Sequence, residues 1–275
     1  MASILHFSDI HFPLAASRIE AADLRHPKRL LATLNYLVRR RFFFSQATDH
    51  WQRFQASMAD KEFDAILCTG DLTTMGTRRE LEHARAQIEP FLHHPAFILL
   101  PGNHDLYLPR QEARHFFDVF ADCYQKPGQI RIEPSSTYPF PFLQLVGDDT
   151  AILAINSAKP NPLLWLSSGR VSDAELEQAK ALAQRPECKN RKLIIATHYN
   201  CDDEDSWRHG LENRKAFREF LEQTNCFLLA HGHVHRSYET TIKNLPTQIC
   251  CAGSLTYRHR ESYRVYQISV EKASL

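Results

Sequence analysis

The feature that most constrains this chain is a series of short apolar runs, rich in β-branched and aromatic residues, that recurs along most of the sequence. Runs of this length and composition favour strands over helices. They occupy residues 3–7, 65–69, 96–100, 151–155, 192–197, 226–230, 248–252 and 263–270. Helical patterns lie between several of them, at 77–92, 172–184 and 212–224, and the first two begin at the capping residues Thr77 and Ser172. Strands that alternate with helices predict an α/β architecture.

Polar clusters follow several of these runs, at the point where each predicted strand ends. They are Ser8 to His11, Gly70 and Asp71, Gly102 to Asp105, Thr197 to Asn200, and His231 to His235. The carboxyl ends of the strands in an open α/β sheet lie along one edge, where such folds place their sites. We therefore expect these clusters to meet in space, although they come from distant parts of the sequence.

The clusters contain carboxylates, imidazoles and one amide, but no thiolates. This mixture suits Mn, Fe, Zn or Co rather than a structural zinc site, which favours cysteine. The ligands exceed what one ion needs, and a carboxylate at a strand end can bridge two ions. Two divalent cations about 3.5–4 Å apart form the standard clamp for in-line displacement at phosphorus, with a bridging water converted to hydroxide near neutral pH. Glycines precede Asp71, Asn103 and His233, and we expect them to let the backbone turn sharply.

Taken in order, the motifs D-x-H, G-D, G-N-H-D, H and G-H-x-H resemble those of the calcineurin-like metallophosphoesterases. They run from Asp9 to His235, cover most of the chain, and are all intact. The resemblance implies an α/β fold in which a two-sheet β-sandwich is flanked by helices, with a dinuclear metal centre at its edge. We expect residues 1–275 to form a single domain of this kind, with a specificity insert at 18–50.

The resemblance also implies roles for individual residues. One divalent metal ion would be held by Asp9, His11, Asp71 and His235. The other would be held by Asp71, Asn103, His198 and His233, with Asp71 bridging the two ions. His104 would contact the phosphate and assist the leaving group, and Asp105 would orient His104. These roles describe a metal-dependent phosphoesterase in which hydroxide attacks phosphorus in line, without a covalent intermediate.

The residues within the motifs bear on the class of substrate. The serine/threonine protein phosphatases carry GDxVDRG and GNHE, whereas this chain has GDLTTMG and GNHD, which argues against a phosphoprotein substrate. The set GDLT, GNHD and HGHVHR looks closest to bacterial phosphodiesterases of the cyclic-nucleotide type. We therefore expect a phosphodiesterase for a small nucleotide-type substrate. The alternative is a pyrophosphatase of a lipid-like nucleotide sugar of the UDP-diacylglucosamine type, because related enzymes keep the same motifs.

Two other function classes are disfavoured. A nuclease would use the same metals but should show a basic groove, and the formal net charge of +1 gives no support for one. A non-catalytic scaffold of this fold would be expected to have lost a ligand or His104, and none is missing. We therefore expect a small phosphoester or pyrophosphate as the partner, rather than a nucleic acid.

The sequence also bears on the compartment. No signal-peptide pattern is visible at the N-terminus, and no apolar stretch approaches the ~18 residues of a spanning helix. The seven cysteines are an odd number without a C-x-x-C pair, which is typical of reduced thiols. We therefore expect a cytoplasmic protein without a transmembrane segment.

The segment 27–45, PKRLLATLNYLVRRRFFFS, predicts an amphipathic helix with Pro27 in its first turn. Its apolar stripe consists of Leu30, Leu31, Leu34, Leu37 and Val38. Our preferred interpretation packs this stripe against the sheet, leaves Arg39 to Arg41 in solvent and places Phe42 to Phe44 in a satellite core. One alternative is a lid beside the metals, in which the arginines hold phosphate and the aromatic rings hold a base or acyl chain. Another is peripheral contact with a membrane surface.

Two histidines outside the ligand motifs need separate interpretations. His6 lies inside a predicted strand, and we expect it to be a core residue whose ring nitrogens are hydrogen-bonded. His231 precedes the glycine of G-H-x-H, and we expect it to bond the backbone or support a ligand.

Overall fold

The computed structural model describes residues 1–13, 19–109, 111–132, 139–201, 207–242, 245–258 and 261–269, and in these its strands form two sheets. The four-stranded sheet has the order β11-β1-β2-β3, and its strands are β1 (Ala2–Phe7), β2 (Ala65–Cys68), β3 (Phe97–Leu99) and β11 (Arg264–Ile268). The seven-stranded sheet has the order β4-β5-β6-β7-β8-β10-β9. Its strands are β4 (Gln129–Ile130), β5 (Phe142–Val146), β6 (Thr150–Ala154), β7 (Lys192–Ala196), β8 (Leu228–His231), β9 (Tyr238–Thr241) and β10 (Gln248–Cys251).

The strands that carry the polar clusters are parallel to their neighbours. β2 pairs in parallel with β1 and β3, and β7 pairs in parallel with β8. Parallel neighbours end on the same edge of a sheet, so the loops that follow them lie side by side. One apolar core contains residues of both sheets, including Phe7 and Phe97 from one and Ile152 and Ile194 from the other.

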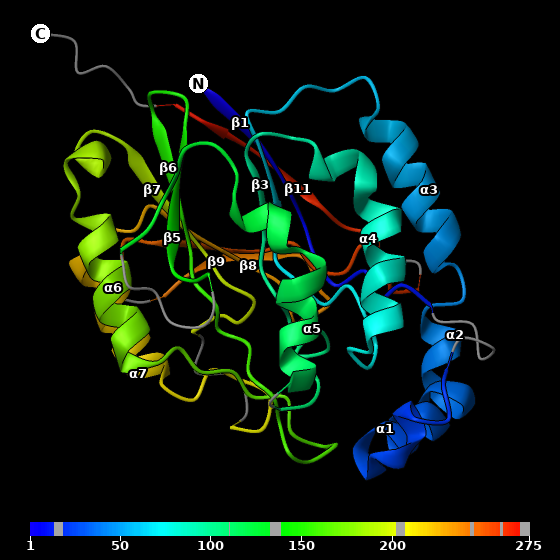
Figure 1. Ribbon diagram of the computed structural model, residues 1–275. Helices are drawn as coiled ribbons and strands as arrows, with labels where there is room; N and C mark the ends of the chain where they lie inside the picture. The colour runs from blue at the N-terminus through cyan, green and yellow to red at the C-terminus, as the bar shows by residue number, and fades with distance from the viewer. Residues whose placement is uncertain are drawn as a thin grey trace, which may run out of the picture.

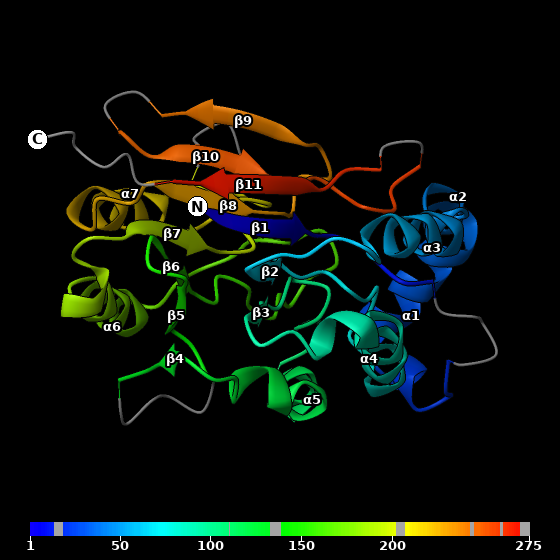
Figure 2. The same cartoon turned by 90° about the horizontal axis from the view of Figure 1, so that it is seen from above.

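Helices cover the outer faces of the two sheets. They are α1 (Pro27–Asn35), α2 (Arg41–Phe43), α3 (Ala47–Met58), α4 (Arg78–Leu92), α5 (Gln111–Val119), α6 (Asp173–Ala183) and α7 (Arg214–Gln223), with the short helical turns η2 (Asp23–Arg25), η3 (Tyr36–Arg40), η4 (Ala121–Tyr124) and η5 (Pro186–Cys188). Figures 1 and 2 show α3 to α5 beside the four-stranded sheet and α6 and α7 beside the seven-stranded sheet. The predicted two-sheet α/β fold flanked by helices is therefore confirmed.

Every apolar run named in the sequence forms a strand, with small shifts at the ends. The capping residues are also confirmed, because Thr77 and Ser172 each accept a hydrogen bond from the glutamate three positions on, in complete capping boxes. The short strands β4, β5 and β9 and the helices α3 and α5 were not predicted. None of the helices that the structure describes combines the length and the apolar character that a membrane-crossing segment needs. All the cysteines are free and buried, as expected.

The segment 27–45 is helical as predicted, but the face that it buries is the opposite one. α1 continues through the π-helical η3 into α2. The residues of α1 that are buried are Lys28, Arg29, Ala32 and Thr33. The large apolar residues that remain exposed are Leu30, Leu31, Leu34, Val38 and Phe42, between 44 % and 75 % exposed. The preferred interpretation was therefore wrong for the leucine stripe and for Phe42, whereas Arg39 and Arg41 are exposed and Phe44 is buried, as that interpretation expected.

His6 and His231 are both fully buried. The ring nitrogens of His6 lie 2.8 Å from the Tyr266 hydroxyl and 3.0 Å from the Thr69 hydroxyl, so its assignment as a hydrogen-bonded core residue is confirmed. Burial lowers the pKa of His6 to about 3. Nδ1 of His231 lies 2.9 Å from the Gly232 carbonyl oxygen, a backbone contact of the expected kind.

Candidate metal centre

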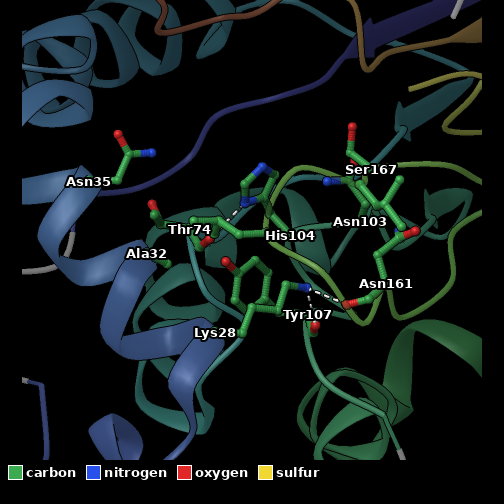
Figure 3. A pocket seen from close by; sticks show the side chains of 11 residues that line it. Lys28, Ala32, Asn35, Thr74, Asn103, His104, Tyr107, Asn161 and Ser167 are labelled. Atoms are coloured by element: carbon green, nitrogen blue, oxygen red, sulfur yellow. Dashed lines mark hydrogen bonds between the residues drawn. The ribbon is translucent and has the colours of Figure 1, made fainter. Parts of the chain in front are cut away.

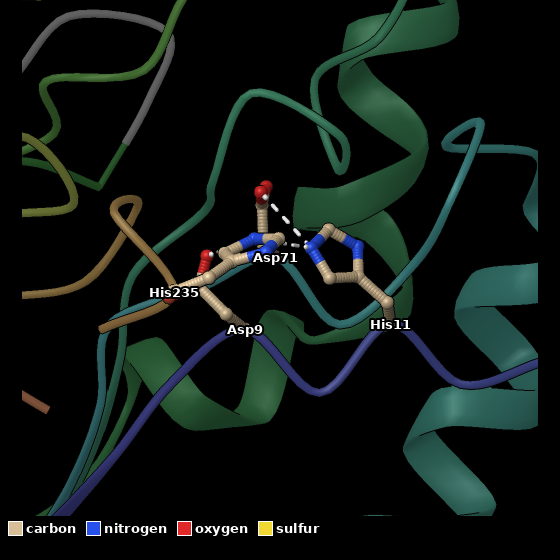
Figure 4. Close-up of side chains that lie close together, drawn as sticks. All are labelled: Asp9, His11, Asp71 and His235. Atoms are coloured by element: carbon tan, nitrogen blue, oxygen red, sulfur yellow. Dashed lines mark hydrogen bonds and ion pairs between the residues drawn. The ribbon is translucent and has the colours of Figure 1, made fainter. Parts of the chain in front are cut away.

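The loops after β1, β2 and β8 bring a first group of ligand atoms together where the two sheets meet. One nitrogen or carboxylate oxygen from each of four residues lies within 4.8 Å of all the others, and these residues are Asp9, His11, Asp71 and His235 (Figure 4). Nε2 of His235 lies 3.1 Å from Nε2 of His11 and 3.2 Å from Oδ1 of Asp9. The structure thus brings the first predicted set of ligands together.

The loops after β3, β7 and β8 form a second group beside the first. Oδ1 of Asn103 lies 3.1 Å from Nδ1 of His233 and 3.3 Å from Nε2 of His198. Oδ2 of Asp71 lies 3.6 Å from Nε2 of His11 and also 3.6 Å from Nε2 of His198. A single carboxylate oxygen therefore faces one histidine of each group, which is the position that a bridging ligand needs.

The backbone at these ligands has an uncommon conformation. Among the described residues, most of the non-glycine residues with a left-handed backbone belong to the two groups, with φ from 45° to 70°: Asp9, His11, Asp71, His233 and His235. This conformation costs a residue roughly 1–2 kcal/mol, and aspartate and histidine adopt it more often than most. Hydrogen bonds between the loops hold it, for example from the Asp9 N–H to the Gly70 carbonyl oxygen at 2.9 Å. The chain itself therefore sets the direction of each ligand.

The glycines that precede the ligands serve two different purposes. Gly70 has φ 98°, so it makes the sharp turn that the sequence predicts. Gly102 is needed for close approach instead, because a Cβ there would lie 2.0 Å from Oδ1 of Asp71. A Cβ on Gly232 would lie equally close to the Ser8 hydroxyl oxygen. At these two positions the glycine makes room for a neighbouring loop.

Backbone carbonyl groups fix the tautomers of three ligand histidines. Nδ1–H of His11 donates to the Thr73 carbonyl oxygen at 2.8 Å, and Nδ1–H of His198 donates to that of Thr69 at 2.7 Å. His233 uses its other nitrogen, and Nε2–H donates to the His209 carbonyl oxygen at 2.7 Å. A carbonyl oxygen can only accept, so in each neutral ring the remaining nitrogen presents a lone pair to the centre. Lone pairs and carboxylate oxygens that converge without a proton between them are the donor set that a cation needs.

The pKa shifts of the candidate ligands also indicate a site for a cation. Burial raises the pKa of Asp71 well above its usual range, and the nearby carboxylates of Asp9 and Asp105 raise it further. Burial acts to raise the pKa of Asp9, but the hydrogen bond and charge of His235, the charge of His198 and the Ser8 hydroxyl together outweigh it and hold this pKa well below the usual range. Burial lowers the pKa of His233 to about 3, so its ring is neutral at pH 7. Neutral imidazoles and crowded buried carboxylates are stabilised together by bound positive charge.

His104 and Asp105 differ from the pairing that we expected. Nδ1 of the His104 ring lies 2.7 Å from the Thr74 carbonyl oxygen, and its backbone N–H donates to Oδ1 of Asp71 at 2.8 Å. The carboxylate of Asp105 turns back into the loops, where it accepts from the N–H groups of Asp71 at 2.8 Å and Gly102 at 2.9 Å. The Thr74 carbonyl oxygen, rather than Asp105, therefore orients the His104 ring. Asp105 instead joins the loops after β2 and β3.

Two cavities meet at His104. One has a volume of about 310 Å³ and opens over the ligands, and the other has about 170 Å³ and extends from His104 toward α1 (Figure 3). Both are lined by Asn103, His104 and Ser167. The larger cavity is also lined by His209, whose Nδ1 lies 2.6 Å from the Ser167 hydroxyl oxygen. The Ser167–His209 pair was not predicted, because both residues lie in irregular loops that match no motif.

Helix α1 forms a wall of the smaller cavity, and two buried cations hold it there. Nζ of Lys28 donates to the carbonyl oxygens of Tyr107 and Asn161, both at 2.8 Å (Figure 3). The guanidinium of Arg29 donates to the Gly76 carbonyl oxygen at 3.2 Å and to the Glu112 carboxylate at 3.1 Å. Burial lowers the pKa of Lys28 to about 8, and the neighbouring Arg29 adds to this effect. These contacts explain why the cationic face of α1, rather than its leucine face, is turned inward.

The fold resembles solved structures of a phosphatase and a hydrolase. A dimetal phosphatase from Danio rerio is 12 % identical, with a TM-score of 0.63 over 96 % of this chain and 91 % of that one. A phosphopantetheinyl hydrolase from Mycobacterium tuberculosis is 10 % identical, with a TM-score of 0.51 over 99 % of this chain and 98 % of that one. At these identities the likeness concerns the fold alone. A search of curated proteins found no match.

The sequence itself also matches a known family. The model of the calcineurin-like phosphoesterases matches residues 2–237, a range that contains every ligand of both groups and His104. The match covers most of the chain. The chain therefore belongs to the calcineurin-like phosphoesterase family and is a metal-dependent phosphoester hydrolase.

Proposed function

We propose that the centre holds two divalent metal ions and hydrolyses a phosphodiester in a small nucleotide-type substrate. Asp9, His11, Asp71 and His235 would hold one ion, and Asp71, Asn103, His198 and His233 the other. A donor set without thiolates suits Mn, Fe, Zn or Co. A bound pair of this kind supplies charge to the phosphoryl oxygens and lowers the pKa of water near the phosphorus.

The chain's own contribution at the phosphorus is proposed to come from His104. This ring lines both cavities, so a phosphoryl group at the ligands would have it on one side. Because Nδ1 contacts the Thr74 carbonyl oxygen, the Nε2 edge is the one proposed to contact the phosphoryl group and to assist the leaving oxygen. Asp105 is proposed to act through the backbone, since it holds the loop that carries His104 against the loop that carries Asp71.

The observation that carries this proposal is the junction of the two cavities at His104. A diester or pyrophosphate has a substituent on each side of the reacting phosphorus, and the smaller cavity offers room for one of them. Its lining is mostly polar and includes no carboxylate, with side chains that suit a hydroxyl-bearing group, namely Asn35, Thr74, Asn161 and Ser167. We propose residues 18–50, of which residue 18 lies outside the described part, as the insert that sets specificity through this wall.

The experiment compares metal-dependent turnover of bis-p-nitrophenyl phosphate and p-nitrophenyl phosphate. Ala32 lines the smaller cavity on the inner face of α1, so Ala32→Trp should fill it and reduce turnover of the diester much more than that of the monoester. Leu31→Trp on the outer face of the same helix is the matched control and should change neither. Equal loss of both substrates in Ala32→Trp, with full metal content, would refute the use of this cavity.

A second candidate substrate is supported by the apolar part of the same lining. Leu164 and Leu166 border the smaller cavity. These residues favour a pyrophosphatase of a lipid-like nucleotide sugar. A screen of the metal-loaded protein against cyclic nucleotides, nucleotide sugars and lipid-linked pyrophosphates decides between the two candidates, because only the second predicts faster turnover when acyl chains are present.

A further inference from the structure

Helix α1 and its continuation display their apolar side chains outward. Leu30, Leu31, Leu34 and Val38 recur at helical spacing on one face, and Phe42 follows one turn later. We call these five residues the outer face of α1. Single exposed apolar residues need no explanation, but a continuous row of them on one helix marks a surface that another body covers.

This orientation is specified by the opposite side of the helix. Lys28 and Arg29 are only 7 % and 3 % exposed, and backbone carbonyl oxygens from distant loops satisfy them. If the leucines turned inward, both cations would lose their hydrogen bonds to these carbonyl oxygens. The carbonyl groups would then be buried without a donor, which is costly because several of the lost bonds involve charged groups. The display of the outer face is therefore built into the packing of α1.

Charge indicates what covers the outer face. No acidic residue lies between Asp23 and Asp49, whereas Arg25, Arg39 and Arg41 are exposed beside the apolar row. A symmetric contact between two copies of the chain would set these arginines against arginines, because such an interface pairs the same patch with itself. The covering surface is therefore expected to be apolar beneath and anionic at its rim.

We propose that the outer face of α1 rests on an anionic lipid bilayer, with the leucines among the acyl chains and the arginines at the phosphate level. An amphipathic helix with a basic flank lies in the plane of such an interface. Across the smaller cavity from α1, Leu163 and Trp165 are also exposed, and tryptophan is enriched at this depth of a membrane. Trp207 is not counted in this surface, because the sequence has four acidic residues at 202–205, shortly before it.

The outer face and the cavity lie on opposite sides of one helix. Lys28, Ala32 and Asn35 line the cavity (Figure 3). Leu31 and Leu34 belong to the same turns but do not line the cavity, and they are about half exposed. Contact with a bilayer would therefore place the mouth of the catalytic site within a helix diameter of the lipid headgroups, which is about 10 Å.

The test is co-sedimentation of the full-length, metal-loaded protein with lipid vesicles. We expect binding to phosphatidylcholine vesicles that contain about 30 % phosphatidylglycerol, and weaker binding to phosphatidylcholine alone. The triple variant Leu31→Gln, Leu34→Gln, Val38→Gln should bind at least ~10-fold more weakly, because it removes most of the buried apolar area. Val265→Gln on β11 changes a residue that is 41 % exposed outside this surface, and it is the matched control.

Thermal unfolding and metal content establish that the variants are folded, and vesicle binding requires no turnover, so this test is independent of the proposed substrate. Arg39→Gln with Arg41→Gln should remove the preference for anionic vesicles. The proposal is overturned if the native chain binds neither kind of vesicle, or if the triple variant binds as the native chain does. A dimer that the triple variant dissociates, without vesicle binding, would assign the outer face to a second copy instead.

Discussion

The two cavities that meet at His104 form one cleft, and two of its walls are built in opposite ways. One wall carries the candidate metal ligands and is called the ligand wall; the other is formed by α1 and is called the α1 wall. On the ligand wall, polar side chains from several strand ends converge inward, and a left-handed backbone directs many of them. On the α1 wall, two cations point inward to carbonyl groups and the apolar residues point outward. The side chains of the ligand wall converge on one another, whereas the α1 wall leaves the outer face exposed.

The difference teaches which interactions decide local orientation. Burying a leucine side chain contributes about 1.5–3 kcal/mol, so the row on α1 gives up a sizeable stabilisation by staying exposed. The ion–carbonyl contacts of Lys28 and Arg29 outweigh it, because a buried cation or carbonyl group that loses its partner is costly. Hydrogen-bonding partners rather than apolar area therefore select the face that α1 buries.

The largest expected effect breaks the ligand wall. Asp71→Asn removes the charge of the oxygen that faces both histidines, so turnover should fall by more than the ~10²–10⁴ of a lost acid–base group. Metal content, measured by elemental analysis, should fall in the same variant. A variant that keeps both ions and most of its turnover would show that Asp71 does not bridge.

A second variant separates chemistry from metal binding. His104→Gln should keep the metal content and reduce kcat by ~10²–10⁴ with a smaller change in KM. His93→Gln is the control, since His93 is an exposed histidine at the end of α4. Unchanged kcat in His104→Gln would remove this ring from the mechanism.

The packing of α1 can be weakened without substituting any ligand residue. Lys28→Met leaves the carbonyl groups of Tyr107 and Asn161 without their donor, which should lower the free energy of unfolding by about 1–3 kcal/mol. KM for the diester should rise while metal content stays the same. Loss of metal in this variant would mean that the two walls are not independent.

The outer face of α1 should be neutral for stability in solution. Leu34→Gln, at a residue that is 51 % exposed, should change the free energy of unfolding by less than about 0.5 kcal/mol. Leu81→Ala, at a fully buried residue of α4, should cost about 2–5 kcal/mol in the same urea titration. A large loss in Leu34→Gln would indicate that the leucine row is buried after all.

The last prediction concerns the pH dependence of stability. His6 is buried, and its pKa is lowered from 6.5 to about 3. Between these two pH values the unfolded chain is protonated at His6, whereas the folded chain is not. Stability should therefore decline as pH falls from about 6.5 toward 3. In His6→Gln this decline should be shallower by at most ~1.4 kcal/mol per pH unit. Parallel pH profiles for the two proteins would show that His6 does not contribute.

The ligand wall could be predicted from the sequence because its signals are local. Each cluster follows an apolar run, and parallel strand ends must share an edge, so residues as distant as Asp9 and His235 could be placed together. The partner of His104 could not, since it is a main-chain oxygen and carbonyl groups leave no trace in a sequence. Ser167 and His209 were missed for a different reason, because irregular loops that match no motif bring their side chains together.

The α1 wall shows where periodicity fails. The leucine stripe correctly predicts a helix, but a stripe does not say whether the protein interior or another body covers it. The contacts that decide the matter join Lys28 to carbonyl oxygens of Tyr107 and Asn161, far along the chain. Helix α3, in contrast, carries a readable stripe in Trp51, Phe54 and Met58 that our prediction overlooked.

The left-handed ligand positions restrict how this centre can change by mutation. Aspartate, asparagine, histidine and glycine adopt that backbone most readily, and the first three are also donors to cations. At Asp9, His11, Asp71, His233 and His235, a codon change to almost any other amino acid therefore strains the loop as well as deleting a donor. Substitutions at these sites should therefore stay within this small set of amino acids. Exchange among the three donors can change the metal preference of the centre more readily than mutation can remove the centre step by step.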